Sequence, residues 1–313
     1  MTSFKQDVIT GLSADAKYLS SRYFYDEIGD QIFQEIMAMP DYYLTRAEEE
    51  IFQLRKQEIY RALNFKTPFK LVELGAGDGL KTKVLLRSFL EEKANFQYLP
   101  IDISSHVLDE LSASLIKELP QLEVNPMAME YFEALEHLQN ISDEPKLVLF
   151  LGSNIGNFPQ GKATGFLSTL ASKLQKGDKL LLGVDLKKEP AKILKAYSDQ
   201  TGITARFNLN ILARINRELG ANFDLHNFEH YASYNPQSGE CRSYLICRKA
   251  QVVHLDGAAQ SIHFEEHESI HTEISKKYSP TELHRLADET GFKVIEKFYD
   301  SQKQFSDVLL EKR

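Results

Sequence analysis

The stretch that decides the fold reads Val72-Glu73-Leu74-Gly75-Ala76-Gly77-Asp78-Gly79. It continues a short apolar segment, Lys70–Leu74, and precedes Lys81–Glu92, whose apolar residues have helical spacing. Glycine has no Cβ and accepts positive φ, so a glycine-rich turn between a strand and a helix lets a ligand approach the backbone closely. The stretch predicts a ligand-binding turn at the carboxyl end of the first core strand. A tight turn without a ligand is the alternative.

An acidic residue follows at the end of the next predicted strand, Phe96–Ile103. This is Asp102, 27 residues after Gly75, where a carboxylate can accept hydrogen bonds from both ribose hydroxyls of an adenosine. A dinucleotide turn needs a third glycine, but position 80 is leucine, and Glu73 would repel a pyrophosphate. These residues disfavour an NAD-dependent oxidoreductase. The turn resembles the first motif of class I methyltransferases, whose cofactor, S-adenosylmethionine (SAM), is a sulfonium cation without phosphates.

The middle of the chain alternates between strands and helices. Further strands are predicted at Leu122–Pro126, Lys146–Leu151 and Lys179–Asp185, with helices over 107–119, capped by Ser104 or Ser105, and over 160–174. Strands that are apolar on both faces and separated by helices predict an α/β fold with a mostly parallel, doubly wound sheet. Such sheets bind ligands at the carboxyl ends of their strands.

The flanking segments have a different pattern. The N-terminal arm is predicted to be helical, with a capping box at Thr45–Glu48 that opens a long helix. An α+β segment follows Asp185, and a helix and a strand close the chain; these elements are predicted at Pro190–Asp199, Phe207–Leu219, Phe228–Tyr234, Arg242–Arg248, Ile262–Glu265, Pro280–Thr290 and Phe292–Tyr299. We therefore expect a SAM-binding core over 66–187 plus 277–313, and an inserted α+β substrate domain over 1–65 plus 188–276.

Composition narrows the class of protein. The 313 residues carry 37 Lys+Arg against 45 Asp+Glu, a formal charge of −8, which argues against a nucleic-acid binder. No apolar run approaches the ~20 residues that span a bilayer, and the start lacks the apolar core of a signal peptide. Two cysteines make neither a disulfide framework nor a zinc site. We expect a cytoplasmic, monomeric protein without a metal or a membrane partner.

A second site-like motif ends the predicted strand Lys146–Leu151. It reads Phe150-Leu151-Gly152-Ser153-Asn154-Ile155-Gly156-Asn157-Phe158. Asn157 offers a donor and an acceptor, and Gly152 exposes its carbonyl, so the pair can hold an amine and a carboxylate in one orientation. An asparagine-capped turn is equally compatible with the spacing.

Taken together, these motifs identify a family resemblance. The chain resembles the histidine-specific N-alpha-methyltransferases, which form trimethylhistidine (hercynine) in ergothioneine biosynthesis from SAM, releasing S-adenosylhomocysteine. The matching segments are Tyr23–Asp26, Pro40–Glu48, Leu71–Lys81, Phe150–Phe158, Leu182–Leu186, Ala196–Tyr197, Phe207–Asn208, Asn216–Gly220, Phe228–His230 and His271–Tyr278.

The resemblance implies roles for particular residues. Gly152, Asn157, Tyr42 (or Tyr43) and Tyr197 would hold the amine and carboxylate of the amino-acid substrate, and Asn157, Tyr42 and Tyr197 would align it for catalysis. Glu273 and Ser275 would read the imidazole, and strand alternation would place His271, Glu273 and Ser275 on one face. The cofactor residues implied are Gly75, Gly77, Lys81, Asp102, Glu130, Tyr131 and Tyr25, the last closing over the cofactor. Each tyrosine is also compatible with a half-buried structural ring, and Lys81 with a solvated helix residue.

One departure from the family concerns the substrate side chain. The family has a methionine against the histidine ring, and the gapless alignment places Ser243 there, although a one-residue slip would place Tyr244 there instead. Serine removes an apolar wall. The alternative function is therefore the same methylation of another amino acid or small amine, for example an indole-bearing one. A non-catalytic nucleoside-binding protein is a further alternative.

Overall fold

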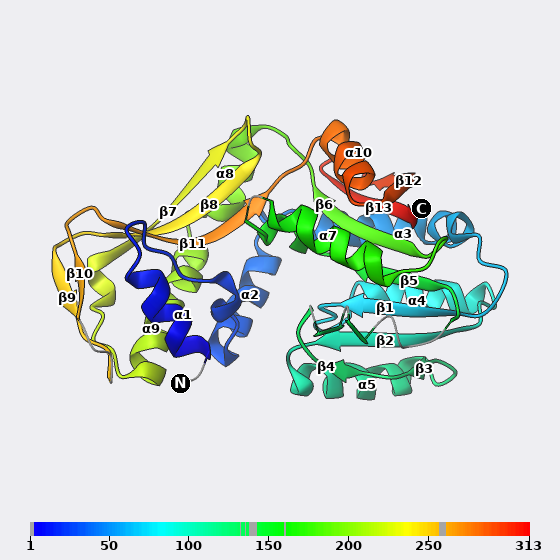
Figure 1. The fold of residues 1–313 in the computed structure, drawn as a ribbon, viewed down its shortest axis with the longest axis horizontal. Helices are drawn as coiled ribbons and strands as arrows, with labels where there is room; N and C mark the ends of the chain where they lie inside the picture. Colours follow the sequence, from blue (N-terminus) through cyan, green and yellow to red (C-terminus); the bar gives the residue numbers. More distant parts are fainter. Residues whose placement is uncertain (1–2, 132, 135, 138–142, 160, 257–260) are drawn as a thin grey trace. The chain divides into compact units, whose positions relative to one another are not determined.

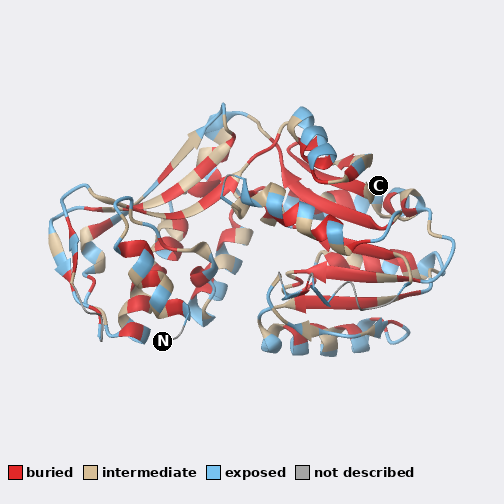
Figure 2. Ribbon diagram, viewed as in Figure 1, coloured by how far each residue is buried: buried red, intermediate tan, exposed pale blue. Residues whose placement is uncertain are grey.

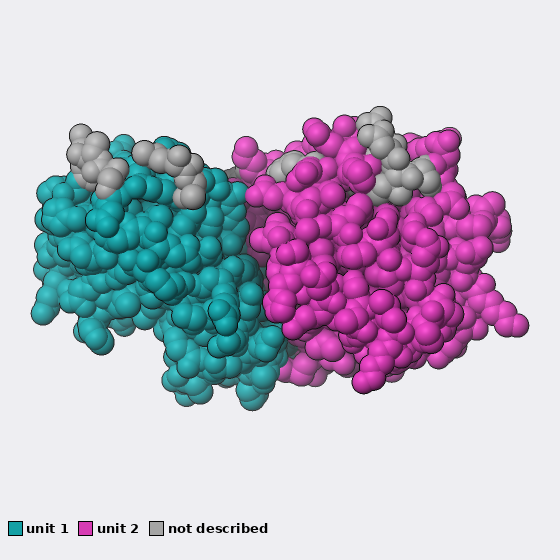
Figure 3. All heavy atoms as spheres, turned by 90° about the horizontal axis from the view of Figure 1, so that it is seen from below, with its two compact units in different colours: residues 1–43, 188–276 teal, residues 44–187, 277–313 magenta. Residues whose placement is uncertain are grey.

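The computed structural model describes residues 3–131, 133–134, 136–137, 143–159, 161–256 and 261–313. Two compact units divide the chain: a larger one of 44–187 with 277–313, and a smaller one of 1–43 with 188–276 (Figure 3). The sequence assigned 44–65 to the smaller domain. Helix α3, Leu44–Leu63, lies in this range and packs on α4 and on strands β6, β12 and β13 of the larger unit. The predicted boundary at residue 65 was therefore wrong, and the smaller unit's N-terminal segment ends at residue 43.

One mixed sheet organises the larger unit (Figure 1). Its order is β12-β13-β6-β5-β1-β2-β3, with β4 also paired to β2. The strands from β6 to β3 run parallel, while β13 is antiparallel to both β6 and β12. The strands are β1 Phe69–Leu74, β2 Phe96–Asp102, β3 Glu123–Val124, β4 Met127–Ala128, β5 Lys146–Phe150, β6 Lys179–Asp185, β12 Phe292–Tyr299 and β13 Phe305–Lys312.

Helices cover both faces of this sheet. The connections β1→β2 and β5→β6 move in opposite directions from the centre, and right-handed crossovers therefore place α4 and α7 on opposite faces (Figure 1). The central strands are buried on both faces, as their apolar runs predicted (Figure 2). Besides α3, the helices are α4 Thr82–Glu91, α5 Ser105–Glu118, the 3-10 turn η2 Asn154–Asn157, α7 Lys162–Lys173 and α10 Pro280–Glu289.

The smaller unit packs helices onto an antiparallel sheet ordered β11-β8-β7. Its core joins apolar residues of the N-terminal arm to those of α9 and the strands. This explains why the arm, far away in sequence, shares a unit with 188–276. The elements are α1 Ser3–Leu12, η1 Ser21–Phe24, α2 Glu27–Ala38, α8 Pro190–Tyr197, α9 Ile203–Leu219, η3 Leu225–Asn227, β7 Phe228–Asn235, β8 Glu240–Cys247, β9 Gln251–Val253, β10 Ile262–Phe264 and β11 Ser269–Lys276.

Most predicted elements lie within a few residues of the observed ones. Ser104 is the cap of α5, because its side chain accepts from the Val107 N–H. The predicted start of α7 at Gln160 lies outside the described residues. Strand β13 was not predicted, although it joins β6 to β12. None of the helices in the part of the chain that the structure describes is long and apolar enough to cross a membrane.

The capping box predicted at Thr45 is wrong. Helix α3 begins at Leu44, so Thr45 lies within it, and the carboxylate of Glu48 hydrogen-bonds to the Gly152 N–H. A capping box does occur at α10, where Ser279 and Glu282 satisfy each other's backbone N–H groups.

Candidate functional site

The glycine turn after β1 needs glycine at two positions for steric reasons. Gly75 and Gly79 have φ of 76° and 62°. A Cβ on Gly75 would lie 2.5 Å from the Tyr131 hydroxyl, and one on Gly79 would lie 2.5 Å from a Leu111 methyl. Tyr131 therefore lies directly against the turn.

Asp102 at the end of β2 fixes the other side of the turn. One of its carboxylate oxygens accepts from the Gly77 N–H at 3.0 Å, and the other accepts from the Ser104 N–H at 3.1 Å. The structure thus brings together Gly75, Gly77 and Asp102. Glu130 is exposed and directly precedes Tyr131.

A cavity opens where the glycine turn after β1 meets the loop after β5. Its lining includes Gly75, Lys81, Gly152 and Asn154. Strands β1 and β5 are neighbours whose connections leave in opposite directions, the point at which open α/β sheets bind ligands. Asn154 belongs to the motif Phe150–Phe158, and no role was predicted for it from the sequence.

A carboxyl group lies beneath this cavity. Glu73 is 3% exposed; it accepts from the Thr82 hydroxyl at 2.6 Å and from the Tyr98 hydroxyl. Burial raises the pKa of Glu73 to about 7, although the two hydroxyl donors oppose the rise. Glu73, whose charge was expected to repel a pyrophosphate, therefore has a pKa close to neutral pH.

A second buried acid, Glu48 of α3, reaches two sides of the cavity. One of its oxygens accepts from the Gly152 N–H at 2.7 Å, and the other pairs with the Lys81 ammonium. Burial lowers the pKa of Lys81, but the charge and hydrogen bond of Glu48 outweigh this and raise it. Lys81 is therefore a charged residue of the cavity rather than a solvated helix residue.

The loop after β5 has two successive left-handed residues, Gly152 and Ser153, with φ of 68° and 59°. The Ser153 hydroxyl is buried and accepts from the Asp185 N–H at 3.0 Å, which ties the loop to β6. The 3-10 turn Asn154–Asn157 follows, and its Ile155 is fully buried. These contacts hold the segment that carries Asn157.

The candidate residues of the smaller unit are connected by aromatic contacts. The rings of Tyr25 and Phe33 are 5.5 Å apart, and those of Phe33 and Tyr42 are 6.4 Å apart. Tyr42 and Tyr197 are 6.4 Å apart in an edge-on arrangement, and the Tyr197 hydroxyl donates to Ser275 Oγ at 2.8 Å. The structure therefore brings Tyr25, Tyr42, Tyr197 and Ser275 into one group.

Tyr43, the alternative to Tyr42, has different partners. It is buried, its hydroxyl accepts from Lys188 Nζ at 2.8 Å, and its ring lies below that ammonium at 4.3 Å. This geometry favours Tyr42 as the member of the group that contains Tyr197.

Ser243 lies directly opposite Glu273 in the register of β8 and β11. Its hydroxyl lies 3.4 Å from a Glu273 carboxylate oxygen, and the residue as a whole is 1% exposed. Directly opposed residues of an antiparallel pair share a face, so Tyr244 points to the other face. The structure places Ser243, not Tyr244, beside Glu273.

The predicted alternation along β11 is wrong at one point. The register shifts between His271 and Glu273, and His271 pairs with Tyr244 while Glu273 pairs with Ser243. An extra residue in one strand, here Thr272, breaks the alternation. His271 therefore lies on the opposite face from Glu273 and Ser275.

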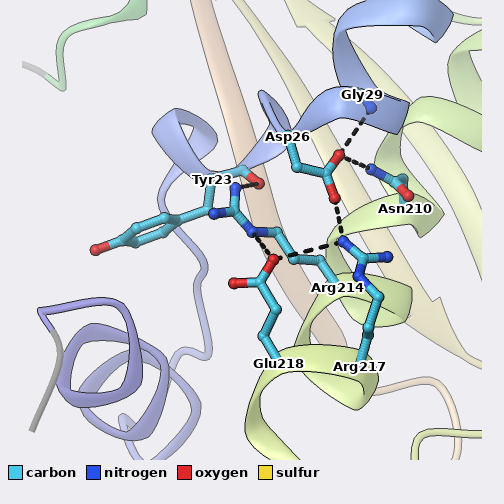
Figure 4. A network of polar contacts seen from close by, with 7 residues as sticks. All are labelled: Tyr23, Asp26, Gly29, Asn210, Arg214, Arg217 and Glu218. Atoms are coloured by element: carbon cyan, nitrogen blue, oxygen red, sulfur yellow. Dashed lines mark hydrogen bonds and ion pairs between the residues drawn. The ribbon is translucent and has the colours of Figure 1, made fainter. Parts of the chain in front are cut away.

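A polar network connects the segment Tyr23–Asp26, which contains Tyr25, to side chains of α9 (Figure 4). Asp26 caps α2 by accepting from the Gly29 N–H at 2.7 Å, and it also accepts from Asn210 at 2.8 Å and pairs with Arg217. Arg214 donates to the Tyr23 carbonyl at 3.1 Å. The network positions the backbone on both sides of Tyr25.

Comparison with known proteins identifies the family of the chain. The family model described as "Histidine-specific methyltransferase, SAM-dependent" matches residues 4–312. The chain belongs to this family. It is 38% identical to the histidine N-alpha-methyltransferase of Mycolicibacterium smegmatis over 93% of this chain and 89% of that protein. It is 36% identical to the protein of the same name from Mycobacterium tuberculosis, over 89% and 85%.

A fungal relative is more distant. Ergothioneine biosynthesis protein 1 of Schizosaccharomyces pombe is 29% identical over 94% of this chain and 39% of its own length. Membership of the family makes this chain a SAM-dependent methyltransferase. The larger unit fits that cofactor: the glycine turn gives close approach, Asp102 ends β2, and the Lys81 ammonium lines the cavity.

Proposed function

We propose that this enzyme methylates the α-amino group of L-histidine three times to give hercynine. The family match over residues 4–312 is the observation that carries this proposal, together with the 36% and 38% identical relatives named for the same activity. The protein would act on a free amino acid in the cytoplasm as a monomer.

The larger unit would bind the methyl donor. In this proposal Gly75, Gly77, Asp102, Glu130 and Tyr131 contact the adenosine portion, and Lys81 contacts the amino-acid tail. SAM supplies an electrophilic methyl group on a sulfonium. The chain would position that donor and exclude water.

The amino-acid end of histidine would be held by Gly152, Asn157, Tyr42 and Tyr197. A free α-amine has a pKa of about 8, so a useful fraction is neutral without a strong base. We therefore assign Asn157 and the two tyrosines to alignment of the lone pair rather than to proton removal. The aromatic group that contains Tyr25, Tyr42 and Tyr197 suits a growing quaternary ammonium, because aromatic faces attract cations.

Glu273 and Ser275 would recognise the imidazole, one accepting from a ring N–H and the other donating to the second ring nitrogen. Their shared face and the Tyr197–Ser275 hydrogen bond support this assignment. Ser243 favours the alternative acceptor, because a small polar residue replaces the family's methionine beside Glu273.

The experiment incubates the purified protein with SAM carrying a deuterated methyl group and with histidine, tryptophan and other amino acids in parallel. Mass spectrometry counts the methyl groups, and fragmentation locates them on the α-nitrogen or the ring. Trimethylation of histidine at the α-nitrogen is expected. Preferential methylation of an indole-bearing amino acid would show that histidine is not the substrate, although the reaction is the same. Absence of product with every acceptor would favour a non-catalytic nucleoside-binding protein.

A pair of variants tests the imidazole assignment. Glu273→Gln should lower kcat/KM for histidine by about tenfold, because the amide keeps one acceptor oxygen but loses the negative charge that strengthens the hydrogen bond from the ring N–H. Glu229→Gln is the matched control: Glu229 is an exposed residue of β7, beside β8 on the same sheet. Equal rates for both variants would contradict the assignment.

A further inference from the structure

Glu48 occupies an unusual position for a glutamate. It is 0% exposed, yet its two carboxylate oxygens serve separate segments of the chain. One accepts from the Gly152 N–H at 2.7 Å and the other pairs with Lys81. Lys81 follows the glycine turn after β1 and Gly152 follows β5, so one side chain joins the two sides of the cavity.

The surrounding strands are shaped to admit this carboxylate. Gly183 of β6 lies beside it, and any Cβ on Gly183 would overlap a Glu48 oxygen. Every larger residue at 183 would therefore displace Glu48. The packing holds the carboxylate in one place.

A neighbouring acid affects the charge balance. Asp307 of β13 pairs with Gly183, is 0% exposed, and has no hydrogen-bond partner for its carboxyl oxygens within the described residues. Burial, with the nearby charge of Glu48, raises the pKa of Asp307 well above its usual range. Glu48 is the acid whose oxygen pairs directly with the Lys81 ammonium.

We propose that Glu48 is a positioning residue that fixes the Lys81 ammonium and the Gly152 backbone to receive the amino-acid tail of the methyl donor. The inference rests on the assignment of Lys81 to donor binding in the proposed function. Lys81 is 26% exposed and lines the cavity, and an ammonium has three donors, of which Glu48 takes one. The tail of the donor carries the carboxylate that can accept another.

Replacement by glutamine separates positioning from charge. The Glu48→Gln side chain keeps one acceptor oxygen and turns an N–H₂ donor toward either Gly152 or Lys81, so one of them faces another donor. The amino-acid tail of the ligand is a zwitterion. Loss of the negative charge of Glu48 would therefore strengthen the binding of the tail's carboxylate and weaken the binding of its ammonium. The net electrostatic effect is small, and the loss of positioning remains.

The experiment measures binding to the full-length variants by calorimetry with two probes. S-adenosylhomocysteine carries the amino-acid tail, while 5′-methylthioadenosine shares the adenosine and thioether but lacks the tail's amine and carboxylate. Glu48→Gln should raise the Kd of S-adenosylhomocysteine by about tenfold, as expected for one misplaced buried donor, and change that of methylthioadenosine by less than about twofold. Glu49→Gln, an exposed neighbour on α3, should change neither.

A second variant protects the test against misfolding. Glu48→Asp keeps the charge but is one methylene too short to reach both partners, so it should show the same tail-selective loss, with circular dichroism as the check on folding. Equal weakening of both ligands, or of neither, would overturn the proposal. Failure of the wild-type protein to bind S-adenosylhomocysteine would also overturn it. Tail-selective loss without methylation of histidine would reject only the acceptor.

Discussion

Glu73→Gln should change how stability depends on pH. Glu73 is 3% exposed, and burial raises its pKa from 4.5 to about 7. A glutamine keeps the size and an acceptor for the Thr82 or Tyr98 hydroxyl, and the other hydroxyl can rotate to accept. The substitution therefore removes ionisation while keeping most contacts.

The sign and size of the effect follow from linkage. A carboxyl whose pKa is higher in the folded state stabilises the fold fully below pH 4.5, and this contribution is lost as the pH rises through 7. The difference between 4.5 and about 7 corresponds to about 3 kcal/mol, at about 1.4 kcal/mol for each pH unit. The free energy of unfolding of the wild-type protein, minus that of Glu73→Gln, should fall by about this amount between pH 4.5 and 8.

Urea denaturation followed by far-ultraviolet circular dichroism at several pH values measures this difference, with the transitions of the two units fitted separately if they separate. Glu91→Gln, an exposed residue at the end of α4, is the control and should run parallel to the wild type. A flat difference for Glu73→Gln, or one that grows with pH, would refute the reasoning.

Three further substitutions test the packing. Asp26→Ala should lower the free energy of unfolding by about 1–2 kcal/mol through loss of the α2 cap, measured by urea denaturation at neutral pH; no loss would show that the network of Figure 4 is not stabilising. Lys277→Met should cost about 3–5 kcal/mol by leaving Asp185 buried without its ammonium, and adding Asp185→Asn should recover part of the loss. Gly79→Ala, which meets a Leu111 methyl, should lower the melting temperature more than Gly161→Ala, which has positive φ but open space; equal shifts would indicate that strain alone matters.

The sequence predicts the larger unit well where the information is local. The β1–turn–α4 segment combines an apolar run, glycines and a helical pattern within about two dozen residues. Asp102 can be identified because it lies at the end of the next predicted strand. The mostly parallel sheet follows from the alternation of apolar runs with helices. These are properties of neighbours in the chain.

Long-range contacts could not be predicted in the same way. Glu48 bonds to a residue 104 positions away, and the four residues Thr45–Glu48 match a capping box that the fold does not use. Asp307 is fully buried within β13. An acidic residue in the middle of a strand is unusual for a core strand, so the sequence pattern did not indicate that this segment belongs to the sheet. The extra residue at Thr272 puts His271 on the opposite face of β11 from Glu273. The alternating polar and apolar residues of the sequence give no sign of this shift.

The sequence suggests which residue types could form the candidate site, but it does not give their geometry. The tyrosines were recognised as a group, whereas the choice of Tyr42 over Tyr43 depends on which ring two lysines cover. Ser243 was identified by alignment, and only the register of β8 and β11 decides that it neighbours Glu273.

The way the chain passes between the two units has a consequence for its synthesis. The smaller unit combines residues 1–43 with 188–276, and the larger sheet needs β13, which sits between β6 and β12. The ribosome synthesises the chain from the N-terminus, so residues 1–43 cannot pack until residues 188–276 have been made. Strand β6 likewise has an unpaired edge until β13 has been synthesised. Exposed edges of this kind invite aggregation, and we expect nascent chains that end before residue 305 to depend on chaperones.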